Sequence, residues 1–240
     1  EWIGGRFIHT LDQKAYKLQN KKFEVTIGVE RDDISDDNIG MYGPLFQEMG
    51  QQAEEHTDEL VFETLADGFQ TECYDGQNYF DTEHPVGLGE NPELVSNFYD
   101  GAGPAWYLMD VSRPLKPLIY QDREAVEFQM QDDPDNPHVF KRDEFLYGAR
   151  KRGVSGFGFW QMAFASKEPL TAENYEKVRT AMRSQHDDHG NKLVVRPKLL
   201  VVPPQLEGAA LRLLNNEYGE GGATNEWKGT AEIHGEERLG

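Results

Sequence analysis

Residues 41–66 read MYGPLFQEMGQQAEEHTDELVFETLA, and this stretch decides the fold. Its apolar residues recur every three to four positions, as they do along one side of an amphipathic helix. An unbroken helix of this length would extend about 39 Å. We expect Asp36 or Asp37 to cap its start, and the alternative is a break at 56–58 with a new cap there. The apolar residues are Tyr42, Leu45, Phe46, Met49, Ala53, Leu60, Val61 and Leu65.

The residues before this helix predict an extended arm. Segment 16–31, YKLQNKKFEVTIGVER, alternates apolar and polar residues, which is typical of a strand with one covered face. We expect it to form a hairpin with a strand around 15–18, and residues 6–10 to extend this ribbon. Because a two-stranded ribbon buries few side chains, it needs a partner surface. The acidic stretch 32–38, DDISDDN, then predicts a turn.

The remaining residues predict a mixed α+β chain. Apolar spacing predicts helices over 170–184 and 206–214, and the polar segment 132–138, DDPDNPH, predicts a turn or flexible tip. Residues 87–104 are rich in Gly, Pro, Asn and Asp and predict a loop. The strand-like runs are 106–110, 118–121, 125–130, 156–165 and 199–202, with a weak one at 231–240.

Composition excludes several classes of protein. The net charge of −19 over 240 residues repels nucleic acid backbones, which argues against sequence-specific DNA binding. No apolar run approaches the roughly 18 residues of a membrane span. The single cysteine rules out an internal disulfide. The first residues, EWIGGRFIHT, lack a signal-peptide pattern and an initiating methionine, so we expect a processed or truncated chain.

The densest group of reactive side chains is in 73–86, CYDGQNYFDTEHPV. One cysteine and one histidine are too few for a structural zinc site built from Cys and His ligands. Asp75-Gly76 has the chemistry of a tight turn, and we expect His84-Pro85 to end the extended run. We therefore interpret the segment as framework, and we predict no catalytic, cofactor-binding or metal-binding residue.

Two other segments suggest metal sites more weakly. His186 and His189 in HDDHG have helical spacing, and the alternatives are a divalent metal site or a solvated helix end stopped by Gly190. In DDISDDN, counted from Asp33, the sixth and twelfth positions are Asn38 and Pro44 rather than the glycine and glutamate of a calcium loop.

Several longer segments of the sequence resemble a known family. In order along the chain they are EWIGGR, NKKFEVTIGVERDDISDDNIGMY, FQEMG, GFQTECYDGQNYFDTEHPV, SRPLKPLIYQDR, FLYGARKRGVSGFGFWQMA and LLVVPPQLEGAALRLLN. This series, from residue 1 to roughly residue 230, resembles the major head subunit of Mu-like phages and prophages, the gpT family. The blocks are long and unusual, so the resemblance is specific.

The resemblance implies a major capsid protein with the Hong Kong 97-type fold, which has an extended hairpin loop, a long spine helix, and peripheral and axial domains. On this basis residues 1–35 are the extended loop region, 36–70 the spine helix, and 71–240 the remaining peripheral and axial elements. The N-terminal arm that precedes EWIGGR in the family is not part of this sequence. The implied partners are other copies of the chain in hexamers and pentamers, scaffold, portal and decoration proteins, and packaged DNA in the virion.

We expect self-assembly to use the predicted ribbon and acidic turn, because their charges have opposite signs and complementary charges set register between subunits. Two alternatives remain: an encapsulin-like compartment with the same fold, or an acidic metal-dependent hydrolase that uses Asp75, Asp81, His84 or the His186–His189 pair. The expected self-assembly residues are Tyr16, Lys21, Lys22, Phe23, Val25, Ile27, Arg31, Asp32, Asp33, Asp36 and Asp37.

Overall fold

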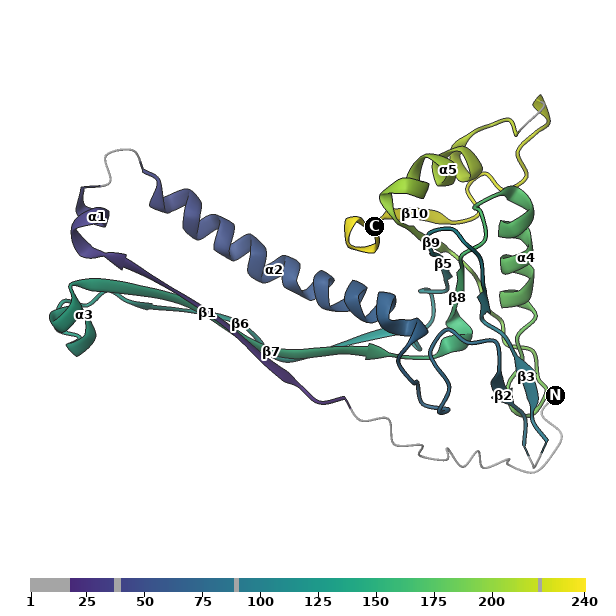
Figure 1. The fold of residues 1–240 in the computed structure, drawn as a ribbon, viewed down its shortest axis with the longest axis horizontal. Helices are drawn as coiled ribbons and strands as arrows, with labels where there is room; N and C mark the ends of the chain where they lie inside the picture. The colour runs from purple at the N-terminus through teal and green to yellow at the C-terminus, as the bar shows by residue number, and fades with distance from the viewer. Residues whose placement is uncertain (1–17, 37–39, 89–90, 220–221) are drawn as a thin grey trace, which may run out of the picture.

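The structure is a computed structural model that describes residues 18–36, 40–88, 91–219 and 222–240. A long arm extends from a compact body, and Figure 1 shows the arm on the left and the body on the right. The arm consists of a three-stranded antiparallel sheet in the order β1-β7-β6, with helix α2 along one side. Its elements are β1 (Lys21–Glu30), α1 (Arg31–Ser35), α2 (Tyr42–Ala66), β6 (Leu118–Gln131), α3 (Pro137–Arg142) and β7 (Glu144–Phe157).

Helix α2 confirms the predicted long helix. It continues without a break for 25 residues, so the alternative of a break at 56–58 is wrong. The expected cap is also wrong: Met41 precedes the helix without a side-chain cap, and Asp36 instead ends α1. Asp37 lies outside the described residues. The sheet contacts the helix at its middle, where Lys151 Nζ on β7 donates to Thr57 Oγ1 at 2.9 Å.

Strand β1 corrects the predicted ribbon. It pairs with β7 in antiparallel register from Lys21↔Gly153 to Glu30↔Glu144, so its partner is a distant strand of the same chain. Of the expected hairpin partner around 15–18, residues 15–17 lie outside the described residues. Phe23 is half-buried, and its ring contacts His56 of α2 with 4.3 Å between centroids. The strand is therefore one edge of a sheet within its own chain. The expected extension at 6–10 lies outside the described residues.

The sheet of the arm contains a strand that the pattern did not predict. Residues of the run 156–165 divide between β7 and β8, and β7 begins at Glu144. The two runs 118–121 and 125–130 join in one strand, β6, whose pairing with β7 shifts register between Asp122 and Glu127. A Cβ at Gly153 would clash with the Tyr120 side chain, so glycine permits the close approach of these two strands. The tip of the hairpin is a turn followed by helix α3.

The body is built on a five-stranded sheet in the order β10-β9-β5-β8-β4. Helices α4 (Ala172–Arg183) and α5 (Pro204–Asn215) confirm the two predicted helices. The described residues also include a separate two-stranded pair and short 3-10 helices. The elements are β2 (His84–Val86), β3 (Glu93–Val95), β4 (Phe98–Tyr99), β5 (Trp106–Met109), β8 (Ala163–Ser166), β9 (Leu199–Val202), β10 (Glu232–Gly235), η1 (Asp67–Phe69), η2 (Trp160–Met162) and η4 (Glu237–Leu239).

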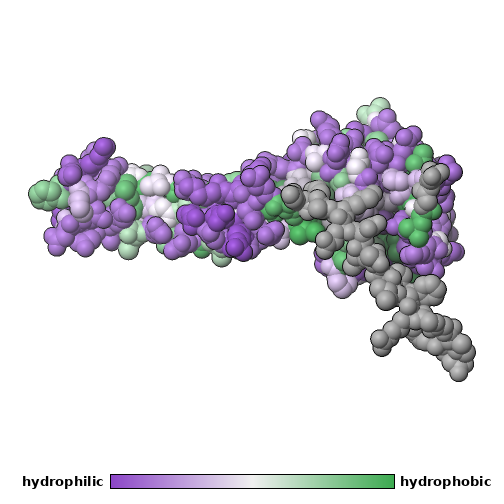
Figure 2. Space-filling model, turned by 90° about the horizontal axis from the view of Figure 1, so that it is seen from below, coloured by the Kyte–Doolittle hydropathy of each residue, from purple (hydrophilic) through white to green (hydrophobic). Residues whose placement is uncertain are grey.

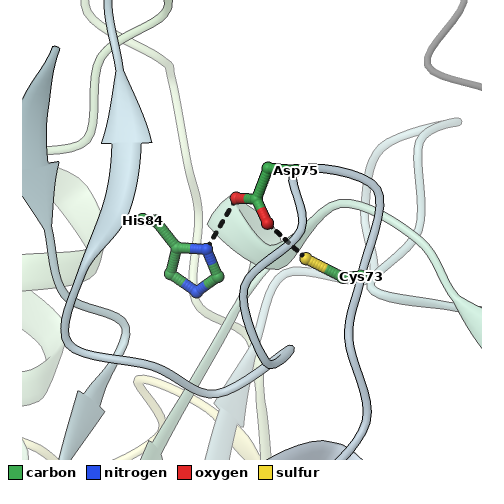
Figure 3. A group of neighbouring side chains, drawn as sticks. All are labelled: Cys73, Asp75 and His84. Atoms are coloured by element: carbon green, nitrogen blue, oxygen red, sulfur yellow. Dashed lines mark hydrogen bonds and ion pairs between the residues drawn. The ribbon is translucent and has the colours of Figure 1, made fainter.

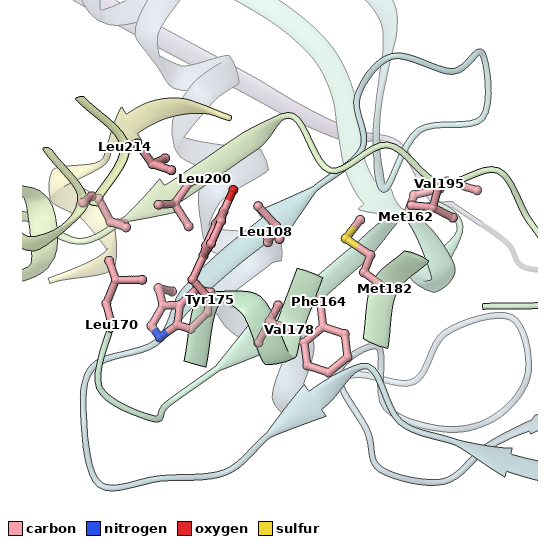
Figure 4. Packing of buried hydrophobic residues seen from close by; sticks show 13 residues of the cluster. Leu108, Met162, Phe164, Leu170, Tyr175, Val178, Met182, Val195, Leu200 and Leu214 are labelled. Carbon is pink, nitrogen blue, oxygen red and sulfur yellow. The ribbon is translucent and has the colours of Figure 1, made fainter. Parts of the chain in front are cut away.

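The central strands of the body are buried on both faces. In β5, Trp106 and Leu108 contribute to one core, and Tyr107 and Met109 contribute to the other. Figure 4 shows the first core, in which the β-strands pack against Tyr175, Val178 and Met182 of α4. The second core lies where the end of α2 and the bases of β6 and β7 meet the body. It fixes the arm to the body. Within the described residues, no helix has the length and apolar character needed to cross a membrane.

Candidate functional site

The helix and the two edge strands of the arm bury few residues, and the buried residues of its sheet lie mainly on the middle strand β7. Leu65 is the only buried residue among the 25 of α2, and β6 has no buried residue among its 14. In β1 only Val29 is buried. Two layers with this little burial are marginal alone, because a helix and sheet are stabilised mainly by packing of their apolar faces. The arm is therefore the part of the molecule that gains most from contact with another molecule.

Large apolar side chains are exposed on the outer half of this arm. Figure 2 shows apolar surface interrupting the hydrophilic arm, including at its far end. Met130 near the end of β6 is 62% exposed, and Phe140 on α3 is 84% exposed. Ile119, at the base of β6, is also exposed. We call the exposed large apolar residues farther out along the arm the arm patch, and they are Val25, Met41, Leu45, Phe128, Met130 and Phe140.

Helix α3 presents Phe140 outward for a local reason. The Asn136 side chain caps its start by accepting from the His138 N–H at 2.9 Å, and Asp143 ends it in the left-handed conformation. Between these caps Val139 is buried, so the next residue, Phe140, must point away from the sheet. Lys141 and Arg142 follow it in the last turn. The tip of the arm is thus an apolar ring followed by two positive charges.

The residues expected to carry self-assembly lie mostly on β1 and α1. Lys22 pairs with Glu24 at 2.7 Å, and Arg31 lies 4.0 Å from Asp143, so both cations have partners in their own chain. Val25 is exposed, whereas Phe23 and Ile27 are half-buried. Asp32, Asp33 and Asp36 are exposed in and after α1, and Lys21 is exposed at the start of β1. Tyr16 and Asp37 lie outside the described residues.

A second candidate site is buried where the chain leaves α2. Figure 3 shows the Asp75 carboxylate between the Cys73 thiol and the His84 ring. Cys73 Sγ donates to Asp75 Oδ1 at 3.0 Å, and His84 Nδ1 lies 2.7 Å from Asp75 Oδ2. The predicted tight turn is present: Gly76 has φ +90°, and the Gln77 N–H donates to Asp75 Oδ1 at 3.0 Å. We call Cys73, Asp75 and His84 the buried cluster.

Residues distant in sequence fix the orientation of His84. Its ring stacks on the Trp160 indole with 4.0 Å between centroids, and Nε2 lies 3.2 Å from Asn97 Oδ1. His84 and Asn97 are fully buried. The expectation that His84-Pro85 ends an extended run is wrong, because strand β2 begins at His84. Neither Asn97 nor Trp160 carried a signal in the sequence, since their proximity arises from the tertiary fold.

The electrostatics of the cluster follow from burial. Burial, reinforced by the hydrogen bond to Asp75, raises the pKa of the Cys73 thiol to about 12. Burial also tends to raise the pKa of Asp75, but hydrogen bonds from His84, Cys73 and the Gln77 N–H outweigh it, so the net pKa is below its ordinary value. Cys73 is therefore a protonated donor rather than a reactive thiolate. That chemistry suits framework better than nucleophilic catalysis.

The other predicted metal ligands do not converge. Asp187 accepts from the N–H groups of His189 and Asn191 at 3.0 and 2.8 Å, which closes the turn after α4. Asp188 accepts from the Gly87 N–H at 3.1 Å. Asp81 Oδ1 accepts from the Glu83 N–H at 3.0 Å. Among the described parts of the chain, the buried cluster is the only group of three or more His, Cys, Asp or Glu side chains whose ligand atoms lie close enough together to hold a metal ion.

Comparison with known proteins gives a consistent family. The model of the Mu-like prophage major head subunit gpT family matches residues 1–238. The major capsid protein of Escherichia phage Mu is 45% identical over 243 residues, covering 97% of this chain and 80% of that protein. The Mu-like prophage FluMu major head subunit of Haemophilus influenzae is 47% identical over 225 residues, covering 90% of this chain and 73% of that protein.

Solved structures extend the comparison to the fold. A chain of the bacteriophage JBD30 capsid superimposes with a TM-score of 0.84 at 34% identity, covering all of this chain and 82% of that one. A chain of the JBD30 procapsid superimposes with a TM-score of 0.77 at 43% identity, covering 97% of this chain and 83% of that one. A third chain comes from the JBD30 capsid decorated with minor capsid protein trimers. It superimposes with a TM-score of 0.80 at 35% identity, covering 100% of this chain and 81% of that one.

Proposed function

Since the chain belongs to the Mu-like prophage major head subunit gpT family, we propose that its arm carries the contacts that close an icosahedral shell around double-stranded DNA. The chain is a major capsid protein with the Hong Kong 97-type fold, and it assembles with copies of itself into the shell of a phage virion. The predictions of family, fold and function are confirmed. The compartment and hydrolase alternatives gain no support.

The low burial of the arm carries this proposal. A helix of 25 residues with one buried residue lies on a sheet whose β6 edge has none. A neighbouring subunit that covers the arm patch would bury apolar surface that this chain leaves in water. Burial of such surface is favourable by roughly 25 cal/mol per Å² of apolar area. Many such contacts around a closed shell add up, although each is modest. The arm with α2 corresponds in this proposal to the peripheral domain, and the body to the axial domain.

Strand β1 and α1 take a narrower role in the proposal than the sequence suggested. Lys21, Lys22 and Val25 lie on the edge strand β1 and Arg31 begins α1 directly after it, where a neighbour can pair with the strand or oppose its charges. Asp32, Asp33 and Asp36 extend this edge with negative charge. Phe23 and Ile27 instead support the contact with α2 from within the subunit, since both are half-buried.

The proposed partners are hexamers and pentamers of this chain, scaffold and portal proteins, and decoration proteins on the outer surface. A decorated relative supports the last of these: the JBD30 capsid carries minor capsid protein trimers. Packaged DNA would be enclosed without sequence-specific contacts, because a net charge of −19 repels phosphates and keeps the wall from binding its contents. Assembly in the host cytoplasm belongs to the same proposal. The protein has no catalytic role in it.

Removal of the arm tip tests this function. Replacement of 132–143, which contains α3, by Asn-Gly joins β6 to β7 through a four-residue hairpin loop, because Gln131 pairs with Leu146. We expect a soluble subunit with an unchanged body that fails to form shells in sedimentation and electron microscopy. A same-length replacement that keeps Phe140 and the Asn136 cap but alanine-substitutes the exposed 132–135 should assemble normally. Normal shells from the tip deletion would contradict the proposed role of the arm.

A further inference from the structure

The buried cluster combines three kinds of donor that zinc-class metals use. One ligand atom each from Cys73, Asp75 and His84 lies within 4.8 Å of the other two. Thiolate, carboxylate and imidazole all bind zinc, with bond lengths of about 2.0 to 2.3 Å. The cluster lies beneath the turn 73–77, whose Gly76 is exposed, so solvent is one turn of backbone away. The shell function assigns this cluster no role.

The fixed orientation of Asn97 determines which nitrogen of His84 faces the cluster. Asn97 Nδ2 donates to the Tyr79 carbonyl at 2.8 Å, and its Oδ1 accepts from the Asp81 N–H at 2.9 Å. Because this amide cannot be turned over without losing both bonds, Oδ1 is the atom that faces His84 Nε2, and Nε2 must carry a hydrogen. Metal-binding histidines are held in this way, with the second nitrogen donating to a protein oxygen. Nδ1 is then left to point at Asp75.

The charges of the cluster balance when an ion replaces two protons. Without an ion, one proton lies on the Cys73 thiol and one lies between His84 Nδ1 and Asp75 Oδ2. With the proton between His84 and Asp75 counted, the three groups sum to zero. A thiolate, a carboxylate, a neutral imidazole and a divalent cation also sum to zero, with two protons released to solvent. The exchange therefore adds no net charge to the buried site. Burial of an uncompensated charge is the main free-energy cost of a buried ion site, and this exchange avoids it.

The required movement is small. Zinc bond lengths in a tetrahedron separate neighbouring ligand atoms by roughly 3.3 to 3.7 Å. The present contacts of 3.0 Å from Cys73 to Asp75 and 2.7 Å from Asp75 to His84 must therefore open by less than about 1 Å. The third pair, Cys73 and His84, lies within 4.8 Å and must close to the same range. The turn at Gly76 can supply this shift, while Trp160 and Asn97 hold the ring of His84 in place.

We propose that Cys73 Sγ, a carboxylate oxygen of Asp75 and Nδ1 of His84 bind one divalent transition metal ion of the zinc class, with water as the fourth ligand. The ion joins the turn that follows α2 to the start of β2, so its role is structural. This goes beyond the shell function and departs from the sequence-based prediction that the segment binds no metal. It agrees with the interpretation of the segment as framework.

Cobalt is a direct probe, because Cys73 is the only cysteine of the chain. The whole protein is stripped with a chelator and titrated with Co²⁺ and, separately, with Zn²⁺. We expect one ion per chain, a thiolate-to-cobalt charge-transfer band together with the strong visible bands of four-coordinate cobalt, and displacement of both by Zn²⁺. Thermal unfolding should shift upward as Zn²⁺ is added, since ligands of the folded state stabilise it.

Variants assign the bands to residues. Cys73→Ser should abolish the charge-transfer band, and His84→Gln should weaken binding at least tenfold. The double variant His186→Gln/His189→Gln is the matched control and should bind as the parent does. If Cys73→Ser fails to fold, the charge-transfer band of the unmodified protein is sufficient to show that Cys73 binds the metal, because the chain has no other thiol. Absence of binding, binding without a charge-transfer band, or binding lost in the control variant would each overturn the proposal.

Discussion

The ring of Phe46 on α2 contacts the ring of Tyr147 on β7, with 4.3 Å between their centroids. This pair joins the outer half of the helix to the sheet, 10 residues before the contact of His56 with Phe23. It lies in a region where no residue of the helix is buried. The outer half of α2 is therefore held by side-chain pairs rather than by a core.

Phe46→Ala should loosen the outer arm and leave the body intact. An aromatic pair contributes about 0.5 to 1.5 kcal/mol beyond the area that it buries. We expect faster hydrogen exchange at 42–50 and no change in exchange across β5 and β9. Leu45→Ala is the control, because Leu45 is exposed and belongs to the arm patch. Equal loss of protection in both variants would show that the pair does not hold the helix.

Leu108→Ala should destabilise the body. Leu108 is fully buried in the central strand β5, and such truncations cost about 2 to 5 kcal/mol through lost transfer energy and the cavity left behind. Leu211→Ala on the exposed side of α5 should change the free energy of unfolding by less than about 0.5 kcal/mol. Urea denaturation measures both. Similar losses would mean that the sheet is not the core of the body.

Asp110 should make the body sensitive to acid. Burial raises the pKa of this carboxyl, but hydrogen bonds from the Ser112 hydroxyl and from the N–H groups of Ser112 and Arg196 outweigh it, so the net pKa lies below its ordinary value. Since the folded-state pKa is depressed, the stabilisation is present above the unfolded pKa. It is lost as the pH falls through the folded pKa.

Asp110→Asn tests this contribution. At pH 7 the variant should be less stable by about 2 kcal/mol, because the Arg196 N–H loses its charged acceptor. The difference from the parent should shrink as the pH falls below the ordinary aspartate pKa of about 3.9 and through the lower pKa of the folded state. Asp58→Asn on the exposed face of α2 controls for net charge. A difference that stays constant with pH would contradict the assigned hydrogen bonds.

The sequence predicts those elements of the fold that a local pattern of residues marks. The α2 helix and the helices α4 and α5 follow from apolar spacing, because each packs one face against a sheet. The turn at Asp75-Gly76 follows from local backbone chemistry. Strand β7 escaped detection because it is the middle strand of a thin sheet, rich in charge and glycine, so no period-two apolar pattern marks it.

Pairing and clustering could not be predicted because they are tertiary. The partner of β1 lies more than a hundred residues away on β7, whereas local reasoning favours a hairpin with the preceding residues. Likewise, Asp75 and His84 are near in sequence, but Asn97 and Trp160, which orient His84, are brought in by β4 and η2. The framework interpretation of the cluster needed only local turn chemistry, whereas its geometry as a donor set required the fold.

Met130→Gln and Phe140→Ser should impair assembly without unfolding the subunit. Both side chains are mostly exposed, so the free energy of unfolding should change by less than about 0.5 kcal/mol. If a neighbour covers them, each loses an apolar contact of about 1.5 to 3 kcal/mol in the shell. Sedimentation should show fewer shells and more free subunits. Val194→Ser, at a body residue as exposed as Met130 at 62%, is the matched control.

A cryo-electron microscopy reconstruction of particles assembled from this chain tests the central claim most directly. We predict closed icosahedral shells in which a neighbouring subunit covers the arm patch, with Phe140 and Met130 removed from solvent and α2 contacted along its exposed side. Shells in which the outer arm stays in solvent, or a monodisperse monomer under all assembly conditions, would contradict the assignment of the arm as the element that builds the shell.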